Sequence, residues 1–191
     1  MDSTAGFVLT GGRSSRMGRD KALLSIEGTL LVTRTAERVR AAAGSVTLIG
    51  APERYAHLNL PAVADLVPAT ANAGEACGPI GGLYTALETT GADWNLLVAC
   101  DMPGLTTEFL RELLEAAAGR GAACLVPETA SGLHPLCAVY YRSNPAAVKS
   151  AIYAKQFKMH ALLRLIQAVP WPVADAAILE NVNTPPQWEA R

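Results

Sequence analysis

The chain has 191 residues and a mass of 20.0 kDa, of which 50% of the residues are hydrophobic and 17% are charged. This length and composition suit an ordered domain with a sizeable core and exclude wholesale disorder. Lys and Arg total 16 against 17 Asp and Glu, so a net charge of −1 gives no general attraction to nucleic acid or to an anionic membrane. No apolar run approaches the roughly 20 residues of a membrane-spanning helix.

Strand and helix patterns alternate through the first two-thirds of the chain. In order, they predict a strand over 6–10, a helix over 30–43, strands over 45–49 and 62–65, a helix over 79–88, a strand over 94–99, a helix over 106–118, strands over 122–126 and 136–141, helices over 145–153 and 159–166, and a last helical turn over 185–189. The alternation indicates an α/β fold of three layers around a mostly parallel sheet. No linker or repeat divides the chain, so we expect a single domain over residues 1–191.

A cluster of cations follows the first predicted strand. Residues 7–24 read FVLTGGRSSRMGRDKALL, in which a glycine turn precedes three arginines and one lysine. Ligands of open parallel sheets bind beyond the carboxyl ends of the strands, and glycines there let the backbone approach a ligand. Anions, and phosphates above all, suit such a cluster. The pattern fits neither the Walker A nor the GxGxxG motif, and the alternative is a tight turn beside a solvated basic face.

The four cysteines, Cys77, Cys100, Cys124 and Cys137, form no CxxC pair and no zinc-like spacing. The N-terminal residues lack the basic and long apolar regions of a secretion signal. We therefore expect a cytoplasmic protein whose cysteines are free thiols that pack as small core residues.

Several segments together resemble the MobA family of nucleotidyltransferases, which load molybdenum cofactor. Residues 9–24 match the signature LAGGxSxRMGxDKxLL, with Thr10 where alanine is usual. Residues 77–83 (CGPIGGL) look like the GPLxG segment of the family, and residues 99–103 (ACDMP) like its C-D-x-P strand end. Residues 132–136 (GLHPL) are similar to its H-P segment, and residues 181–185 (NVNTP) to its N-x-N-T-P segment.

This resemblance implies a Rossmann-like nucleotidyltransferase fold and an enzyme that transfers GMP from GTP to molybdopterin with release of diphosphate. It also implies Mg²⁺ as the cofactor, GTP and molybdopterin or Mo-molybdopterin as partners, and delivery to molybdoenzyme apo-proteins or carrier proteins. Three other functions remain open from the sequence: a CTP-dependent cytidylyltransferase on the same cofactor, a sugar-phosphate nucleotidyltransferase, and a non-catalytic module that binds nucleotide or delivers cofactor.

The resemblance also implies which residues form the site. Arg16 and Lys21 would neutralise phosphate charge, since arginine binds phosphate bidentately and lysine acts as a point charge. The backbone of Leu9, Thr10, Gly11 and Gly12 would touch the nucleotide, together with Gly78, and the alternative is that these residues merely end a strand. A glycine at 12 and glycines in 78–82 favour GTP over CTP, because they let the backbone approach a purine.

Two aspartates at strand ends complete the expected site. Asp101 ends the apolar strand WNLLVACD, where an acid is costly unless it faces a site or a cation. Mg²⁺ suits it, being held by carboxylates and substrate phosphates; the alternative is a helix cap. Asp65 would contact the nucleotide through base or ribose, or else form a turn. Asn183 and His134 are tentative members: Asn183 would orient metal or phosphate, or form a turn, and His134 would lie on the molybdopterin side, or be structural.

Overall fold

A central sheet of eight strands organises the protein, whose computed structural model describes residues 2–10, 20–66 and 77–182. The sheet contains β1 (Thr4–Leu9), β4 (Thr47–Gly50), β5 (Ala62–Ala64), β6 (Trp94–Ala99), β7 (Cys124–Thr129), β9 (Cys137–Tyr141) and β10 (Val169–Pro172) in the order β10-β7-β9-β6-β1-β4-β5, with β8 (Gly132–Leu133) paired to β7. Strands β6, β1, β4 and β5 are mutually parallel, as are β7 and β10, and β9 runs antiparallel between β6 and β7. The mostly parallel sheet expected from the sequence is confirmed.

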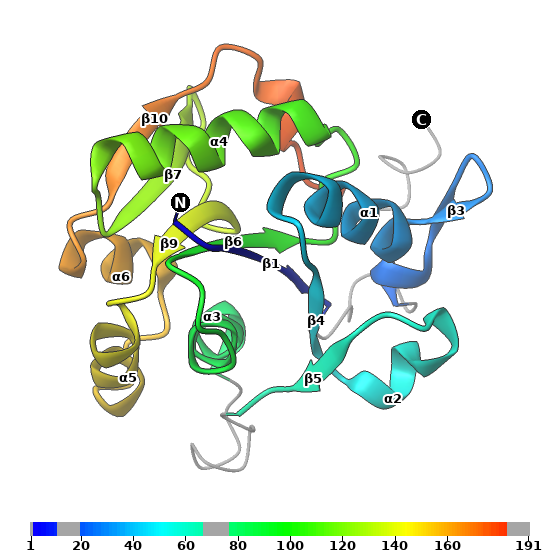
Figure 1. Ribbon diagram of the computed structural model, residues 1–191, viewed down its shortest axis with the longest axis horizontal. Coiled ribbons are helices and arrows are strands. Elements are labelled where there is room, and N and C mark those ends of the chain that lie inside the picture. Colours follow the sequence, from blue (N-terminus) through cyan, green and yellow to red (C-terminus); the bar gives the residue numbers. More distant parts are fainter. Residues whose placement is uncertain (1, 11–19, 67–76, 183–191) are drawn as a thin grey trace.

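Helices cover both faces of this sheet (Figure 1). The helices are α1 (Leu31–Ala43), α2 (Pro52–Tyr55), α3 (Gly78–Glu88), α4 (Thr107–Arg120), α5 (Pro145–Tyr153) and α6 (Met159–Leu165), with short 3-10 turns η1 (Lys21–Leu23), η2 (Ala56–Leu58) and η4 (Ala176–Leu179). Helices α1 and α4 pack together on one face, and α3, α5 and α6 lie on the other. The expected three layers are therefore present.

The two faces of the sheet carry separate apolar clusters, because successive strand residues point to opposite sides. In β1, Val8 belongs to the cluster under α1 and α4, whereas Phe7 and Leu9 belong to the cluster under α3, α5 and α6. In β6, Leu96 and Leu97 divide in the same way. Burial of each such side chain contributes about 1.5–3 kcal/mol, so the central strands are the rigid base on which the strand ends are held.

Local signals in the sequence set the helix boundaries. Helix α1 ends at Gly44, which has φ of 77° and donates its N–H to the carbonyl of Arg40, as the glycine at that position predicts. Helix α4 begins after Thr106, whose hydroxyl accepts a hydrogen bond from the N–H of Phe109. These two caps fix where α1 ends and where α4 begins over the sheet.

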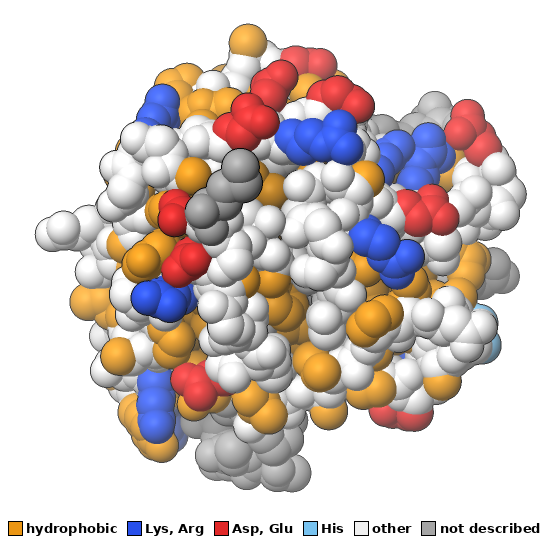
Figure 2. Space-filling view, viewed as in Figure 1, with side chains coloured by type: hydrophobic (Ala, Val, Ile, Leu, Met, Phe, Trp, Pro, Cys, Tyr) orange, Lys and Arg blue, Asp and Glu red, His pale blue; other side chains and the backbone are white. Residues whose placement is uncertain are grey.

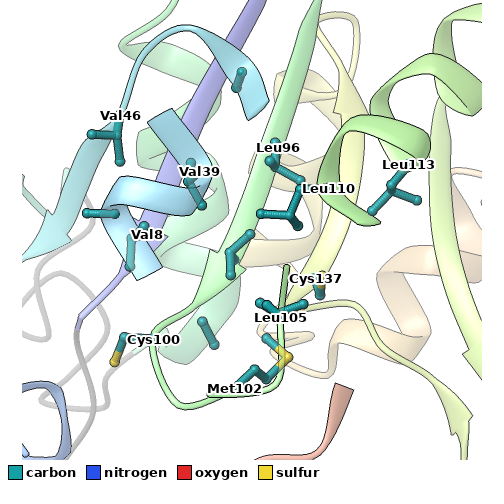
Figure 3. Close-up of a cluster of buried hydrophobic side chains, with 14 of the residues drawn as sticks. Val8, Val39, Val46, Leu96, Cys100, Met102, Leu105, Leu110, Leu113 and Cys137 are labelled. Carbon is teal, nitrogen blue, oxygen red and sulfur yellow. The ribbon is translucent and has the colours of Figure 1, made fainter. Parts of the chain in front are cut away.

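The apolar cluster between α1, α4 and the sheet extends beneath the turn that follows β6 (Figure 3). Cys100, Met102 and Leu105 are all buried members of this cluster. Asp101 therefore sits in a turn whose neighbouring side chains on both sides are packed into the core, which holds its carboxylate in a fixed position at the strand end.

A close approach between β1 and α1 requires glycine at position 6. A Cβ atom there would lie 2.6 Å from the carbonyl oxygen of Ser45 and would overlap a methyl group of Val39. We expect Gly6→Ala to lower the free energy of unfolding by about 1–3 kcal/mol, the usual cost of overpacking, measured by urea denaturation. Gly119→Ala in α4 is the control, because nothing lies within 4 Å of its Cβ; it should be neutral or stabilise by up to about 1 kcal/mol. Equal effects of the two changes would contradict this account.

The surface mixes charges of both signs, and Figure 2 shows Lys and Arg interspersed with Asp and Glu over the face in view. Within the described ranges, no helix is long and apolar enough to cross a membrane. All four cysteines are buried free thiols, as expected. The short helices and strands β2 (Ser25–Ile26), β3 (Thr29–Leu30), α2, β8 and β10 were missed, as were the 3-10 turns, because two to four residues are too few to show a period. The expected helical turn over 185–189 lies outside the described residues.

Candidate functional site

The candidate site lies at the edge of the sheet where β1, β4, β5 and β6 all end. These strands are parallel, so their carboxyl ends share one edge. Thr10 follows β1, Asp65 lies just beyond β5, and Asp101 lies just beyond β6. The topology thus brings together, at one edge, three of the residues expected from the sequence.

Asp101 is a largely buried charged residue at this edge. Its carboxylate oxygen Oδ2 lies 3.9 Å from the Nζ of Lys21, and the two side chains are only 19% and 20% exposed. Burial raises the pKa of Asp101, while the nearby Lys21 ammonium opposes that shift. Its other oxygen, Oδ1, is buried and has no hydrogen-bond partner within the part of the chain that the structure describes. A buried anionic oxygen without a partner is costly unless a cation or ligand meets it.

Lys21 reaches Asp101 because η1 begins at that lysine. Asp20 caps this short turn: its Oδ1 accepts a hydrogen bond from the N–H of Ala22 at 3.1 Å. The methyl group of Ala22 is buried against the core, and the N–H of Leu31 donates to the carbonyl of Leu24 at 2.8 Å. The turn is therefore anchored at its cap, its middle and its end.

Thr10 is held at the tip of β1 by the neighbouring strand. Both its N–H and its hydroxyl donate to the carbonyl of Ile49, at 3.0 and 2.9 Å. Its own carbonyl oxygen lies 3.0 Å from the hydroxyl of Tyr55, and that hydroxyl is 2.9 Å from Oδ2 of Asp20. The Tyr55 hydroxyl therefore contacts polar groups of the two residues that flank positions 11–19, namely Thr10 and Asp20.

Asp65 lies against the first turns of α3. The hydroxyl of Thr85 is 2.8 Å from its Oδ1 and also accepts a hydrogen bond from the N–H of Leu66. A Cβ on Gly81 would lie 3.1 Å from Oδ2 of Asp65, so glycine preserves the space beside this carboxylate. Gly78 opens the helix with φ of 57°, a conformation that favours glycine. Asp65 therefore lies beside the glycine-rich 78–82 segment.

His134 lies at the same edge of the sheet, on the other side of β6 from Asp65. The N–H of Ala99 donates to the carbonyl of Leu136, which sets the 134–136 segment beside the end of β6. The Nε2 of His134 is 2.8 Å from the hydroxyl of Thr129, which also lies 2.8 Å from the hydroxyl of Ser131. Burial lowers the pKa of His134, which favours its neutral form.

The last described residues return to Asp101, since the N–H of Val182 donates to the Asp101 carbonyl at 2.9 Å. Asn183 is the next residue in the chain, but it lies outside the described residues, as do Gly11, Gly12 and Arg16. The structure therefore positions Leu9, Thr10, Lys21, Asp65, Gly78, Asp101 and His134 and tests nothing about the other four.

A divalent ion fits this site only if a substrate helps to hold it. Among the described residues, no group of three or more His, Cys, Asp and Glu side chains could bind a metal on its own. Asp101 supplies one buried oxygen that lacks a partner there. Mg²⁺ is commonly held by one or two carboxylates with phosphates and water, so a carboxylate at an anion-binding edge matches its chemistry.

Sequence reasoning overlooked two residues that support the site, Tyr55 and Thr85. Tyr55 ends α2, whose only sequence signal was Pro52 at its start. Thr85 lies inside α3 and is fully buried, a position at which a polar residue needs an internal partner. The sequence could have singled out Thr85 as a polar residue in an apolar helix close to the 78–82 glycine segment. Its hydrogen-bond partners, however, depend on the fold.

Comparison with known proteins adds a family match. The family described as "MobA-like NTP transferase domain" matches residues 6–169 of the chain. A protein from Nostoc sp. named "Probable molybdenum cofactor guanylyltransferase" is 34% identical over 191 residues, which cover 97% of this chain and 88% of that protein.

Two solved structures show the same fold. The molybdopterin-guanine dinucleotide biosynthesis protein A from Archaeoglobus fulgidus is 23% identical with a TM-score of 0.80, covering 97% of this chain and 95% of that one. The Rv0371c protein from Mycobacterium tuberculosis H37Rv, in complex with manganese, is 18% identical with a TM-score of 0.67, covering 97% and 96%. At these identities the likeness shows the fold alone.

Proposed function

Because this chain belongs to the MobA-like NTP transferase family, and is thus a nucleotidyltransferase, we propose that it transfers GMP from GTP to the terminal phosphate of molybdopterin, with release of diphosphate. The proposal covers both molybdopterin and Mo-molybdopterin, and it treats residues 1–191 as one nucleotidyltransferase domain. The observation that carries it is the Lys21–Asp101 pair at the carboxyl edge of the sheet, where the family motif coincides with a buried carboxylate oxygen that has no hydrogen-bond partner among the described residues.

The chemistry of this reaction is mainly electrostatic. The attacking group is a phosphate oxygen that is already ionised at neutral pH, so no general base is required. The bond that forms joins this oxygen to the α-phosphorus of GTP, and the bond that breaks releases diphosphate. The enzyme must therefore bring two anions together and stabilise charge on the leaving group.

Lys21 meets this need with a compact positive charge held at the end of β6. We assign it to the phosphates of the nucleotide, where its attraction grows as negative charge builds on the leaving diphosphate. Arg16 is assigned to the same task from its place in the family motif. The backbone of residues 9–12 and Gly78 is assigned to close contacts with the nucleotide, which glycines permit.

Asp101 is assigned to a divalent cation, with Mg²⁺ as the proposed ion. When bound, the ion would act as a Lewis acid on phosphate oxygens. The side chain contributes a carboxylate with one oxygen 3.9 Å from the Lys21 ammonium, and its other oxygen has no hydrogen-bond partner among the described residues. Asn183 follows a residue bonded to the Asp101 carbonyl, which supports a tentative role for Asn183 beside the metal or phosphate.

The strand order suggests how the two substrates divide the edge. Asp65 lies on the β4–β5 side of Asp101, and His134 lies on the β9–β7 side. We assign the nucleoside to the Asp65 side, where the carboxylate accepts hydrogen bonds from base or ribose. Molybdopterin is then assigned to the His134 side, so that the two reacting phosphates meet at Asp101. A half-buried histidine beside Thr129, whose lowered pKa favours the neutral form, suits a pterin-binding or structural role better than phosphate binding.

A non-catalytic binding module is not favoured, because the matching family is a transferase domain. Molybdoenzyme apo-proteins or delivery proteins, as receivers of the product, remain part of the proposal. So does a cytoplasmic location, which the four free thiols support.

The choice of nucleotide is tested directly with purified protein, Mg²⁺ and molybdopterin. We expect dinucleotide product from GTP, with kcat/KM at least about tenfold above that for CTP, since hydrogen-bonding sites discriminate strongly between bases. ATP and a sugar phosphate acceptor serve as controls. Faster turnover of CTP would replace the proposal with the cytidylyltransferase, and transfer to a sugar phosphate in place of molybdopterin would replace it with the sugar-phosphate enzyme.

A further inference from the structure

The hydroxyl of Tyr55 lies where two parts of the site meet. Tyr55 is 1% exposed, and its hydroxyl is 2.9 Å from Oδ2 of Asp20 and 3.0 Å from the carbonyl oxygen of Thr10. The hydroxyl has one proton, which these two oxygens share in a three-centre hydrogen bond, and the charged carboxylate is the stronger acceptor. Tyr55 is 45 residues from Thr10 and 35 from Asp20 in sequence, and its hydroxyl contacts both.

Each of these oxygens belongs to a different rigid part of the site. Thr10 is bonded to β4 through the carbonyl of Ile49, and the adjacent Leu9 carbonyl accepts from the N–H of Cys100, next to Asp101. Asp20 instead caps the turn that begins with Lys21. The Tyr55 hydroxyl therefore joins the part that carries the carboxylate to the part that carries the ammonium.

We propose that Tyr55 is a positioning residue, whose hydroxyl sets the place of Lys21 relative to Asp101 by holding Asp20 against the end of β1. This inference rests on the proposed function for the consequence it has in catalysis, but its geometric content concerns the ligand-free protein alone. Tyr55 makes no contact with substrate in this proposal and acts only through Asp20 and Lys21.

The other side chain that contacts Oδ2 of Asp20 cannot take over the positioning role of the tyrosine. Arg54 reaches Oδ2 of Asp20 at 3.3 Å, but its side chain is 55% exposed. Exposed ion pairs hold geometry weakly because water screens them and the long side chain is flexible. A buried aromatic ring with a single polar tip is more rigid, since its ring is fixed by packing. Arg54→Ala is therefore the matched variant that removes a contact with Asp20 and should leave Lys21 in place.

The first test needs no nucleotide. Trace acetylation of lysine amines with acetic anhydride, read residue by residue by mass spectrometry, reports how accessible each amine is. In Tyr55→Phe we expect Lys21 to react several-fold faster relative to the exposed Lys149 and Lys158 than in the unchanged protein. Arg54→Ala should leave the ratio unchanged. An unaltered Lys21 ratio in a folded Tyr55→Phe protein would overturn the inference, whatever the substrate proves to be.

If Tyr55→Phe fails to fold, as judged by circular dichroism, Asp20→Asn weakens the same contact from the other side. Asparagine keeps a side-chain oxygen to cap the turn at Lys21, but it is a neutral and weaker acceptor for the tyrosine. We expect a smaller increase in Lys21 labelling in the same direction. No increase in that variant would count against the inference equally.

The second test is a double-mutant cycle in turnover. Tyr55→Phe should lower kcat by about tenfold or more, with a smaller change in KM for GTP, because small displacements of a charged group cost mainly the transition state. The same change should have no further effect in a Lys21→Met background. Equal losses in both backgrounds would show that Tyr55 acts independently of Lys21. Faster Lys21 labelling without any GTP turnover would instead uphold the positioning role and reject the proposed function.

Discussion

Asp101→Asn is expected to lower turnover by a factor of about 10²–10³ while the fold stays intact, because the variant removes the anionic ligand proposed for the divalent ion. The measurement is kcat for dinucleotide formation at saturating GTP and Mg²⁺. Some GTP affinity should remain, since the contacts assigned to the nucleotide outside Asp101 are untouched. Full activity in this variant would end the assignment of Asp101 to the metal.

The same variant is expected to be more stable than the parent when divalent ions are absent. Burial raises the pKa of Asp101 above its unfolded value, and the Lys21 ammonium only partly opposes this. For a carboxyl group with a raised folded pKa, stability is present below the unfolded pKa and is lost as pH rises through the folded pKa. Asparagine carries no charge. The urea midpoint of Asp101→Asn should therefore exceed that of the parent at pH values above the folded pKa of Asp101 and converge with it in acid.

Asp93→Asn is the matched control for both measurements. Asp93 lies at the opposite end of β6, accepts hydrogen bonds from Ser3 and pairs with Arg142, and these contacts lower its pKa. Its stabilisation is therefore present above the unfolded pKa and is lost as pH falls. Asparagine at 93 should leave turnover unchanged and should not raise stability at neutral pH. A parallel response of the two variants would refute the special position of Asp101.

Lys21→Met is the second large expected effect, with a loss in kcat of about 10²–10³. Methionine keeps the length and the apolar stem of lysine but removes the ammonium, so it separates charge from packing. Because the charge is assigned to the transition state, kcat should fall more than KM for GTP rises. Loss of the ammonium also removes the attraction that lowers the pKa of Asp101.

Two further variants serve as controls for Lys21→Met, namely Lys21→Arg and Lys158→Met. Arginine restores a positive charge in a larger, planar form, so partial recovery of kcat is expected. Lys158 is exposed at the start of α6, and its replacement should leave kinetics unchanged. If Lys21→Met altered KM alone, the residue would contribute to binding of the ground state and not to the chemical step.

The fold was largely predictable because its central elements are long enough to show a period or a continuous apolar run. Strand β6 was predicted with its observed limits, Trp94–Ala99, because its residues form a largely apolar run that ends shortly before Asp101, and all six are buried. Helices α1 and α4 were predicted over 30–43 and 106–118, close to their observed limits. The elements that were missed are short, and tertiary contacts decide them more than local pattern does.

The candidate site was predictable only where a residue type carries its own signal. Lys21 stood out in a basic motif, and Asp101 stood out as an acid after an apolar strand. Tyr55 carried no such signal, because a single tyrosine in a short helical segment is usually a packing residue. Its role depends on contacts with residues 35 and 45 positions away, which only the packed sheet brings together.

The central claim is that a nucleoside triphosphate binds at the carboxyl edge of the sheet, between Lys21 and a divalent ion held by Asp101. Anomalous diffraction from a crystal soaked with GTP and Mn²⁺, as a stand-in for Mg²⁺, tests it most directly. The account predicts an anomalous peak within about 2.2 Å of an Asp101 carboxylate oxygen, with phosphate density against the Lys21 ammonium and guanosine toward Asp65. Guanosine and manganese at another part of the molecule, with Lys21 and Asp101 still paired only to each other, would contradict it.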